Sequence, residues 1–352
     1  MNGFRAAARI LDDAVRAGVC PAAVAEVGDR SGYRWRHAAG RLTFGADSPG
    51  ATPETVFDLA SLTKVIATAT LAMRQVDAGL TPLDLPVAAA LAAWRGTDRE
   101  TVTVRDLLAH ASGLTAHLPF FRDHSQRAEF EPAICGLPLE YAPRTRSIYS
   151  DLGFILLGFI LADRHTARES LAAQFDELAA CRGWGEIRFH PPPEWRSRTA
   201  PTEMDPWRGR TLVGEVHDEN AWALGGAGGH AGLFGTAVAV GGFARDVLAG
   251  LRGDSPLASQ RTFDAFRTRT AVPGSSRALG WDTRLPTSSC GTRLSPASIG
   301  HTGFTGTSLW IDPVADRYLV LLTNRVHPSR SNEAILAVRP AFHDAVMAAG
   351  RT

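Results

Sequence analysis

The sequence predicts an α+β fold in which the two ends of the chain build one sheet and a mainly helical domain is inserted between them. Two observations support this prediction. Segments with the alternation and turn residues of β-strands occur near both ends, each accompanied by a helix, whereas the middle carries helical patterns separated by Pro- and Gly-rich loops. We therefore expect a discontinuous sheet domain of residues 1–80 and 255–352, a helical domain of residues 81–254, and a functional site in the cleft between them.

The N-terminal segment predicts an amphipathic helix, because Phe4, Ala8, Leu11 and Val15 fall on one stripe and Arg and Asp residues interrupt it. This pattern differs from the uninterrupted apolar core of a secretory signal. The longest apolar stretch elsewhere, residues 152–162, is too short to span a bilayer. We therefore predict no membrane span and a cytoplasmic location.

Two hairpins are expected in the sheet domain. Residues 22–29 and 33–42 are expected to be strands joined by a tight turn at residues 30–32, and apolar and charged residues alternate at the start of the second. Residues 307–311 and 318–323 flank Asp312-Pro313. A closing helix is expected over about residues 332–349. The helical patterns of the middle region are residues 62–78, 104–111, 152–162, 167–181 and 237–251.

Composition narrows the function classes. Of the 352 residues, 45% are hydrophobic and 21% are charged, and the net charge is +1. These values exclude a disordered chain and a nucleic-acid binder held by a strongly basic surface. The four cysteines are scattered and form no C-x-x-C pair, so we expect neither a zinc ribbon nor a dense disulfide framework. A small molecule or a protein is the expected partner, and we predict no metal and no cofactor.

Lys64 is the only lysine among 37 basic residues. Arg does not lose its proton in a protein, whereas a desolvated Lys can, so a single retained Lys indicates a position that requires deprotonation or a compact ammonium group. Chance survival on the surface is the alternative. Ser61 precedes Lys64 by three positions at the start of an apolar helix, so the two side chains share a helical face and can touch.

A hydroxyl placed in this way can become an activated nucleophile. Burial disfavours the charged form of Lys64 and makes it a candidate base, and the helix N-terminus favours negative charge beside Ser61. The alternative for Ser61 is a simple helix N-cap. Because only 20 of the 352 residues are Ser, chance rarely places one at this spacing before the only Lys, which favours the catalytic interpretation.

Two further motifs have structural alternatives of their own. In Tyr149-Ser150-Asp151, the last two residues can simply cap the apolar helix that follows. In His301-Thr302-Gly303, just before a predicted strand, the Gly can mark a bulge or a close approach of two backbones.

Together the three motifs resemble the signature of penicillin-recognising serine enzymes: Ser-x-x-Lys on a helix, Tyr-x-Asn or Ser-x-Asn on a helical domain, and Lys-Thr-Gly on a strand. Their order and spacing resemble those of class C β-lactamase-like serine hydrolases, which include D-alanyl-D-alanine peptidases and β-lactamase-like esterases. The resemblance extends to residues 107–114, 214–237 and 301–313 and so covers almost the whole chain. It implies a β-lactamase/transpeptidase-like fold, in which helices flank an antiparallel sheet.

Carried over by position, the resemblance implies that Ser61 attacks the substrate carbonyl and is acylated, while Lys64 and Tyr149 share the proton transfers. It also implies that the backbone N–H groups of Ser61 and Phe304 form the oxyanion hole. Whether Lys64 or Tyr149 is the general base stays open. The implied substrate-binding residues are Asp151, His301, Thr302 and Gly303.

Two positions depart from the family's usual residues. Asp151 stands where Asn is usual, and an ionised Asp151 near Lys64 favours the ammonium form, which moves the expected base role towards Tyr149. His301 stands where Lys is usual, and an unperturbed His is mostly neutral at pH 7. Since that Lys helps to hold a substrate carboxylate in the family, we expect weaker anion binding and a preference for esters or uncharged amides over β-lactams.

The predicted function is therefore that of a serine hydrolase that forms an acyl-enzyme on Ser61 and acts on small carboxylic esters or amides. A cell-wall muropeptide amidase or D-Ala-type peptidase, acting on a peptidoglycan fragment with weak or no β-lactamase activity, is the first alternative. The alternative of another class is a non-catalytic protein of the same fold that binds a peptide or muropeptide.

Other motifs carry less weight. The run at residues 226–228 lacks the third Gly and the preceding strand of a dinucleotide-binding loop. His217, Asp218 and His230 match no metal-ligand spacing, so we expect structural roles for them beside the cleft. The sequence contains no G-x-S-x-G motif, which argues against an α/β-hydrolase, and His110 is expected to be a structural histidine at a helix end.

Overall fold

Strands from the two ends of the chain pair directly. In the computed structural model, which describes residues 3–349, β1 (Ala22–Asp29) and β11 (Arg317–Thr323) are antiparallel neighbours with Ala25 opposite Leu321. The six-stranded sheet has the order β2-β1-β11-β10-β9-β8, and every neighbouring pair is antiparallel. The predicted antiparallel sheet built from both chain ends is therefore confirmed. Its other strands are β2 (Gly32–Gly40), β8 (Asp282–Thr283), β9 (Ile299–Thr302) and β10 (Ser308–Asp312).

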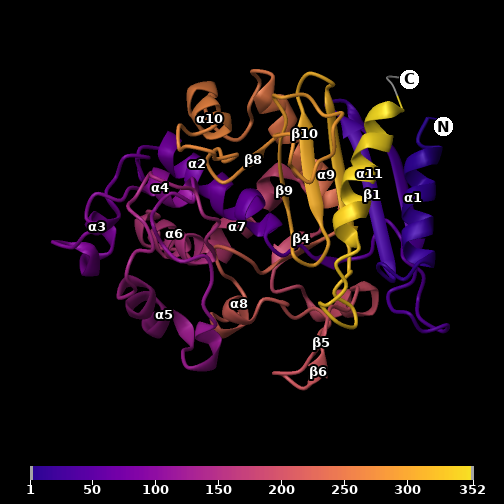
Figure 1. Cartoon of the computed structure of the whole chain (residues 1–352), viewed down its shortest axis with the longest axis horizontal. Helices are drawn as coiled ribbons and strands as arrows, with labels where there is room; N and C mark the ends of the chain where they lie inside the picture. The colour runs from indigo at the N-terminus through magenta and orange to yellow at the C-terminus, as the bar shows by residue number, and fades with distance from the viewer. Residues whose placement is uncertain (1–2, 350–352) are drawn as a thin grey trace.

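Helices cover both faces of this sheet. On one face α1 (Arg5–Arg16) and α11 (Ile335–Ala348) lie side by side, at the end of the molecule where both termini are found (Figure 1). On the other face, α9 (Ala237–Leu251) packs against β1 and β11. The alternation of β1 explains this arrangement, because Ala23, Ala25 and Val27 pack with the α1 and α11 side chains while Val24 faces the larger core.

Helix α9 approaches the sheet closely. A Cβ atom at Gly241 would lie 1.9 Å from Glu26 Oε1 of β1, so a side chain at this helix position would displace the buried Glu26 carboxylate. The sequence assigns helix α9 to the helical domain, which is predicted to end at residue 254. In the structure, however, this helix packs on the sheet. The boundaries at residues 80 and 254 stay a prediction, and residues 1–2 and 350–352 of the predicted sheet domain lie outside the described residues.

The helices predicted in the middle of the chain are present, and all but that over residues 237–251 have shifted ends. The predicted helix over residues 62–78 contains a π-helical segment, η1 (Lys64–Ala69), and continues as α2 (Thr70–Asp77). The helix predicted from residue 104 ends at residue 108, because His110 has a φ of 55°, outside the helical range. The other helices are α3 (Val87–Ala90), η2 (Ala92–Trp94), α4 (Val104–Leu108), η3 (Phe120–Arg122), α5 (Gln126–Cys135), α6 (Asp151–Arg164), α7 (Leu171–Arg182), η4 (Pro193–Arg198), α8 (Glu219–Ala223) and α10 (Gln260–Arg267).

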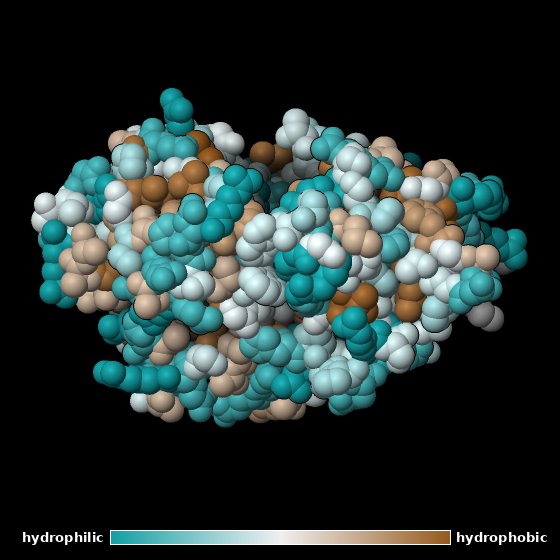
Figure 2. Space-filling model, turned by 90° about the horizontal axis from the view of Figure 1, so that it is seen from below, coloured by the Kyte–Doolittle hydropathy of each residue, from teal (hydrophilic) through white to brown (hydrophobic). Residues whose placement is uncertain are grey.

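Two small sheets tie loops to the centre of the molecule. In the first, β7 (Leu233–Gly235) lies between β3 (Phe57–Asp58) and β4 (Ile187–Phe189), so the segment before Ser61 is fixed beside the segment after His230. The second pairs β5 (Met204–Asp205) with β6 (Arg210–Thr211). No helix within residues 3–349 is long and apolar enough to cross a membrane. On the face shown in Figure 2, hydrophilic residues predominate and apolar residues are scattered among them.

Candidate active site

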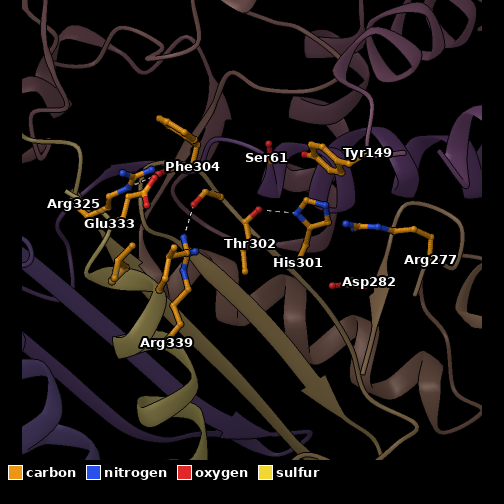
Figure 3. A pocket seen from close by; sticks show the side chains of 13 residues that line it. Ser61, Tyr149, Arg277, Asp282, His301, Thr302, Phe304, Arg325, Glu333 and Arg339 are labelled. Atoms are coloured by element: carbon orange, nitrogen blue, oxygen red, sulfur yellow. Dashed lines mark hydrogen bonds between the residues drawn. The ribbon is translucent and has the colours of Figure 1, made fainter. Parts of the chain in front are cut away.

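A pocket of about 380 Å³ has the predicted nucleophile in its wall. Its lining comes from distant parts of the sequence: Ser61 before η1, Tyr149 before α6, residues 301–304 at the end of β9, and the first turns of α11 (Figure 3). His301 and Thr302 end β9, a strand that was not predicted, and the chain turns over residues 303–307 into β10, the strand expected after this motif. The structure therefore brings together Ser61, Tyr149 and the third motif.

Ser61 follows a strained turn. Ala60 has a φ of 47°, a left-handed conformation that costs a residue with a Cβ atom about 1–2 kcal/mol. The Asp58 carboxylate holds this turn, because Oδ1 accepts from the Ala60 N–H at 2.8 Å and Oδ2 accepts from the His217 N–H at 2.7 Å. The turn places Ser61 at the helix start and at the pocket wall, and backbone strain of this kind clusters at functional sites.

Lys64 is fully buried, and three oxygen atoms lie close to its ammonium nitrogen. Nζ donates to Ser61 Oγ at 3.0 Å and to the backbone carbonyl of His230 at 3.0 Å, and it lies 2.7 Å from Asp151 Oδ1. An ammonium group carries three protons, so this environment suits its charged form. The predicted contact between Ser61 and Lys64 is present, and the catalytic roles of the two residues stay predictions.

Two opposing effects set the charge of this buried pair. Burial lowers the pKa of Lys64, but the Asp151 carboxylate and Tyr149 together outweigh burial and raise that pKa above its ordinary value. Burial likewise raises the pKa of Asp151, yet the Lys64 ammonium group holds it well below its usual range. Lys64 is therefore an ammonium ion in the resting site, as expected from Asp151, and burial alone does not make it a ready base.

Tyr149 completes the cluster. Lys64 Nζ lies 4.8 Å from the centre of the Tyr149 ring, and the Tyr149 hydroxyl points towards Ser61 (Figure 3). Burial raises the pKa of the Tyr149 hydroxyl, although the Lys64 ammonium and hydrogen bonds to Lys64 and Ser61 lower it. Tyr149 is therefore a neutral phenol in the resting site, and neither candidate base is deprotonated in advance.

The His110 ring packs against the Tyr149 ring. The two ring centres are 4.6 Å apart, and His110 Nδ1 accepts a hydrogen bond from the Ser150 N–H at 3.0 Å. Burial lowers the pKa of His110 well below its usual range, which keeps Nδ1 available as an acceptor. The structure therefore gives His110 the structural role that was predicted for it.

The second oxygen of Asp151 faces His117 across 3.6 Å, and this contact raises the pKa of the His117 imidazole. Asp151 is not among the described residues that line the pocket. Its carboxylate is directed to Lys64 and His117, which makes Asp151 the charge partner of Lys64, and its role in substrate binding stays a prediction.

Two backbone N–H groups at the pocket are free. Within the described part of the chain, no protein acceptor receives the N–H of Ser61 or that of Phe304. Gly303 lets this loop approach, since a Cβ atom there would lie 2.7 Å from the Leu59 carbonyl oxygen and 2.1 Å from Thr307 Oγ1. Two free donors beside a hydroxyl nucleophile are the arrangement that an oxyanion hole requires.

His301 is neutral, as expected. Its Nδ1 donates to the Thr302 carbonyl oxygen at 2.8 Å, and burial lowers the pKa of the imidazole well below its usual range. The pocket nevertheless contains cations, since its lining includes Arg277, Arg325 and Arg339 along with the acidic Asp282 and Glu333.

Arg277 stands beside His301, and its guanidinium lies 5.2 Å from the centre of the Tyr149 ring (Figure 3). No acidic side chain in residues 3–349 forms an ion pair with it. Although His301 is neutral, the pocket wall beside it therefore carries a permanent positive charge on Arg277.

His217 and His230 each pair with a different carboxylate. His217 Nε2 lies 2.9 Å from Glu203 Oε2, and His230 Nε2 lies 2.8 Å from Asp218 Oδ1. The second pair orders the loop whose carbonyl accepts from Lys64. These residues therefore have structural contacts beside the site, as predicted.

Sequence reasoning missed His117, Arg277 and Arg339. The first two lie in loops and the third lies on α11, all outside any motif. They reach the site only through tertiary contacts, so no spacing rule nominates them.

Comparisons with known proteins identify the family and the fold. The family model described as Beta-lactamase matches residues 7–341. A "Putative D-alanyl-D-alanine carboxypeptidase" of Escherichia coli (strain K12) is 31% identical over 325 residues, covering 79% of this chain and 70% of that protein. The structure of a class C beta lactamase from Rhodobacter sphaeroides is 20% identical with a TM-score of 0.73, covering 97% of this chain and 98% of that one. The structure of "EstCE1, a hydrolase with promiscuous acyltransferase activity" is 19% identical with a TM-score of 0.77, covering 98% of each chain.

Proposed function

The chain belongs to the beta-lactamase family, and from that premise we propose that Ser61 is the nucleophile of a serine hydrolase that forms an acyl-enzyme. One observation carries the proposal: the Ser61 hydroxyl contacts a buried ammonium group at the wall of a pocket where two backbone N–H groups are free. A serine that merely caps a helix needs neither the ammonium group nor the free donors.

In the proposed reaction, Ser61 Oγ attacks the substrate carbonyl carbon, and the N–H groups of Ser61 and Phe304 stabilise the resulting oxyanion. The Ser61 proton enters the Tyr149–Lys64 pair, and a proton reaches the leaving alcohol or amine as its bond to the carbonyl carbon breaks. Water then hydrolyses the acyl ester and restores the hydroxyl. Since Lys64 and Tyr149 both start protonated, the acceptor of the Ser61 proton must pass its own proton on, so the two groups act as one relay.

Hydrolysis of p-nitrophenyl acetate and butyrate tests the nucleophile. Ser61→Ala should lower kcat by about 10⁴-fold or more, because residues that act as a unit fail together. Ser329→Ala, at an exposed serine of a surface loop, is the matched control and should keep wild-type turnover. Intact-mass measurement after a fluorophosphonate, with peptide mapping, should place the label on Ser61. Near-wild-type turnover in Ser61→Ala contradicts the proposal, and tight muropeptide binding without turnover favours the non-catalytic alternative.

We propose small carboxylic esters or amides as the substrates, because His301 is neutral where the family's Lys helps to hold a carboxylate. A D-Ala-type peptidase is the second candidate, and Arg277 favours it. Its guanidinium beside His301 can hold a substrate carboxylate by charge-assisted hydrogen bonds. The name of the Escherichia coli relative suggests the same substrate class. A cytoplasmic location stays part of the proposal and is tested by cell fractionation.

Arg277→Gln separates the two candidates. For a peptide ending in D-Ala-D-Ala, loss of a hydrogen bond to a charged group should lower kcat/KM about 10- to 100-fold. For p-nitrophenyl butyrate, which carries no carboxylate, kcat/KM should change little. Peptide turnover that depends on Arg277 in this way supports the peptidase, whereas ester turnover with no peptide turnover supports the esterase.

A further inference from the structure

Arg339 is a buried cation at the wall of the pocket. It lies on α11 with 5% of its surface exposed, and its Nη2 donates to the Gly303 carbonyl oxygen at 2.5 Å (Figure 3). Its Nε has no hydrogen-bond partner, and no carboxylate in the described part of the chain forms an ion pair with it. Burial lowers the pKa of Arg339 to about 10. Because burying a charge without a counter-ion is costly, a neutral side chain would suit a purely structural position better.

The carbonyl that Arg339 binds belongs to the same peptide group as the Phe304 N–H. This peptide group is trans, so its C=O and N–H bonds point in opposite directions. A donor on the oxygen side therefore leaves the Phe304 N–H directed away from Arg339. Hydrogen bonds to charged groups are stronger than neutral ones, and two hydrogen bonds at opposite ends of one peptide group strengthen each other by polarisation.

We propose that Arg339 is a positioning residue of the oxyanion hole. Its guanidinium fixes the Gly303–Phe304 peptide group and draws electron density onto the Gly303 oxygen, which makes the Phe304 N–H a stronger donor to the oxyanion. This inference rests on the proposed function, since it presumes that the Phe304 N–H faces a reacting carbonyl.

Arg325 offers a contrast within the same loop. Its Nε donates to the Phe304 carbonyl oxygen at 2.8 Å, and its guanidinium lies 4.4 Å from the centre of the Phe304 ring. That carbonyl belongs to the next peptide group, whose N–H is that of Thr305. Arg325 therefore holds the turn from the oxygen of another peptide group, but it lines the pocket and contacts Phe304. The matched control is instead Arg164→Gln, because Arg164 Nε donates to the Leu80 carbonyl oxygen at 2.7 Å and Arg164 does not line the pocket.

The test compares Arg339→Gln, Arg339→Lys and Arg164→Gln in p-nitrophenyl butyrate hydrolysis and in inhibition by phenylboronic acid. A boronic acid forms a tetrahedral adduct with the serine and places one oxygen in the oxyanion hole. Removal of a whole oxyanion donor costs about 10²–10³ in kcat. We therefore expect Arg339→Gln, which only weakens a donor, to lower kcat and boronic-acid affinity by the same factor of about 10–100, with KM changed less than about 3-fold. Arg339→Lys keeps the charge and should limit both losses to about 3- to 10-fold.

Several results overturn the inference. They are wild-type kcat in Arg339→Gln, a loss confined to KM, a loss of kcat without the matching loss of boronic-acid affinity, or an equal loss in Arg164→Gln. Thermal unfolding checks that each variant is folded. If Arg339→Gln does not fold, Arg339→Lys is used to test the inference. Unequal changes in the kcat and the boronic-acid affinity of Arg339→Lys, or no change in either, then overturn the inference. Failure of the proposed function is seen separately, as wild-type turnover that survives Ser61→Ala.

Discussion

Replacing Asp151 by Asn tests the charge balance around Lys64. The substitution keeps the side-chain shape and removes the carboxylate that lies 2.7 Å from Lys64 Nζ. The buried ammonium group then keeps its other two partners, Ser61 Oγ and the His230 carbonyl, and has no counter-ion at this position. We expect Asp151→Asn to lower the free energy of unfolding at pH 7 and to change its dependence on pH.

The expected size follows from the distance. At 2.7 Å and an effective dielectric constant of about 20, the attraction between two unit charges is about 6 kcal/mol, an upper bound because desolvation opposes it. Removing one partner of a buried ion pair typically costs about 3–5 kcal/mol. Because the Asn amide oxygen can still accept a hydrogen bond from Lys64, we expect a loss near the lower end, about 3 kcal/mol.

The sign of the pH dependence distinguishes this cause from a packing defect. In the wild type, Lys64 has a raised pKa, so its contribution is present below the unfolded-state pKa and is lost as pH rises through the folded-state value. In Asp151→Asn, no carboxylate offsets the effect of burial on the Lys64 ammonium group, so the pKa of Lys64 falls below its unfolded-state value. The unfolded state then binds more protons, and stability rises with pH between the two values. The difference between wild type and variant should therefore shrink from pH 7 towards pH 10.

Urea unfolding of both proteins across this pH range measures the effect. Asp163→Asn is the matched control, because Asp163 pairs with Arg127 at 2.6 Å on the surface with 47% of its side chain exposed. We expect that control to cost less than about 1 kcal/mol, as exposed ion pairs do. A wild-type stability for Asp151→Asn at pH 7, or a stability difference that does not change with pH, would refute the assigned charge state of Lys64.

Two further substitutions test the hydroxyl cluster and the loop at Gly303. Tyr149→Phe should lower kcat about 10²- to 10⁴-fold, because it removes a proton-transfer group. The control Tyr33→Phe, at a residue that is 56% exposed, should leave kcat unchanged. A small loss of kcat in Tyr149→Phe would exclude Tyr149 from the relay. Gly303→Ala should cost at least about 1–3 kcal/mol, because the added Cβ would lie 2.7 Å from the Leu59 carbonyl oxygen, and it should lower kcat about 10²-fold or more by moving the Phe304 N–H. Gly50→Ala, where nothing lies within 4 Å of the added atom, is its control in urea unfolding and ester hydrolysis; equal effects in the two glycine variants would contradict the close approach.

Local patterns were enough to predict most of the sheet and the centre of the site. The short apolar runs of residues 22–29 and 318–323 identify two strands that pair in the structure, and the helix predicted over residues 237–251 has those bounds. Ser61 and Lys64 meet because positions three apart share one face of a helical turn, whatever the rest of the chain does. The need for glycine at residue 303 is also visible in its motif, since a close backbone approach excludes a side chain.

The sequence by itself thus determined the strands, most helices and the pair Ser61–Lys64, because these depend on neighbours within a few residues. The resemblance already implied Asp151 near Lys64, but only the tertiary structure decided how close the two lie and which further charges line the site. Asp151 reaches Lys64, Arg277 reaches the wall beside His301, and Arg339 reaches the Gly303 carbonyl across separations that no periodicity records. Whether burial or a carboxylate sets the charge of Lys64 depends on distances of a few ångströms and on exclusion of water, and both arise only when the two halves of the chain pack together.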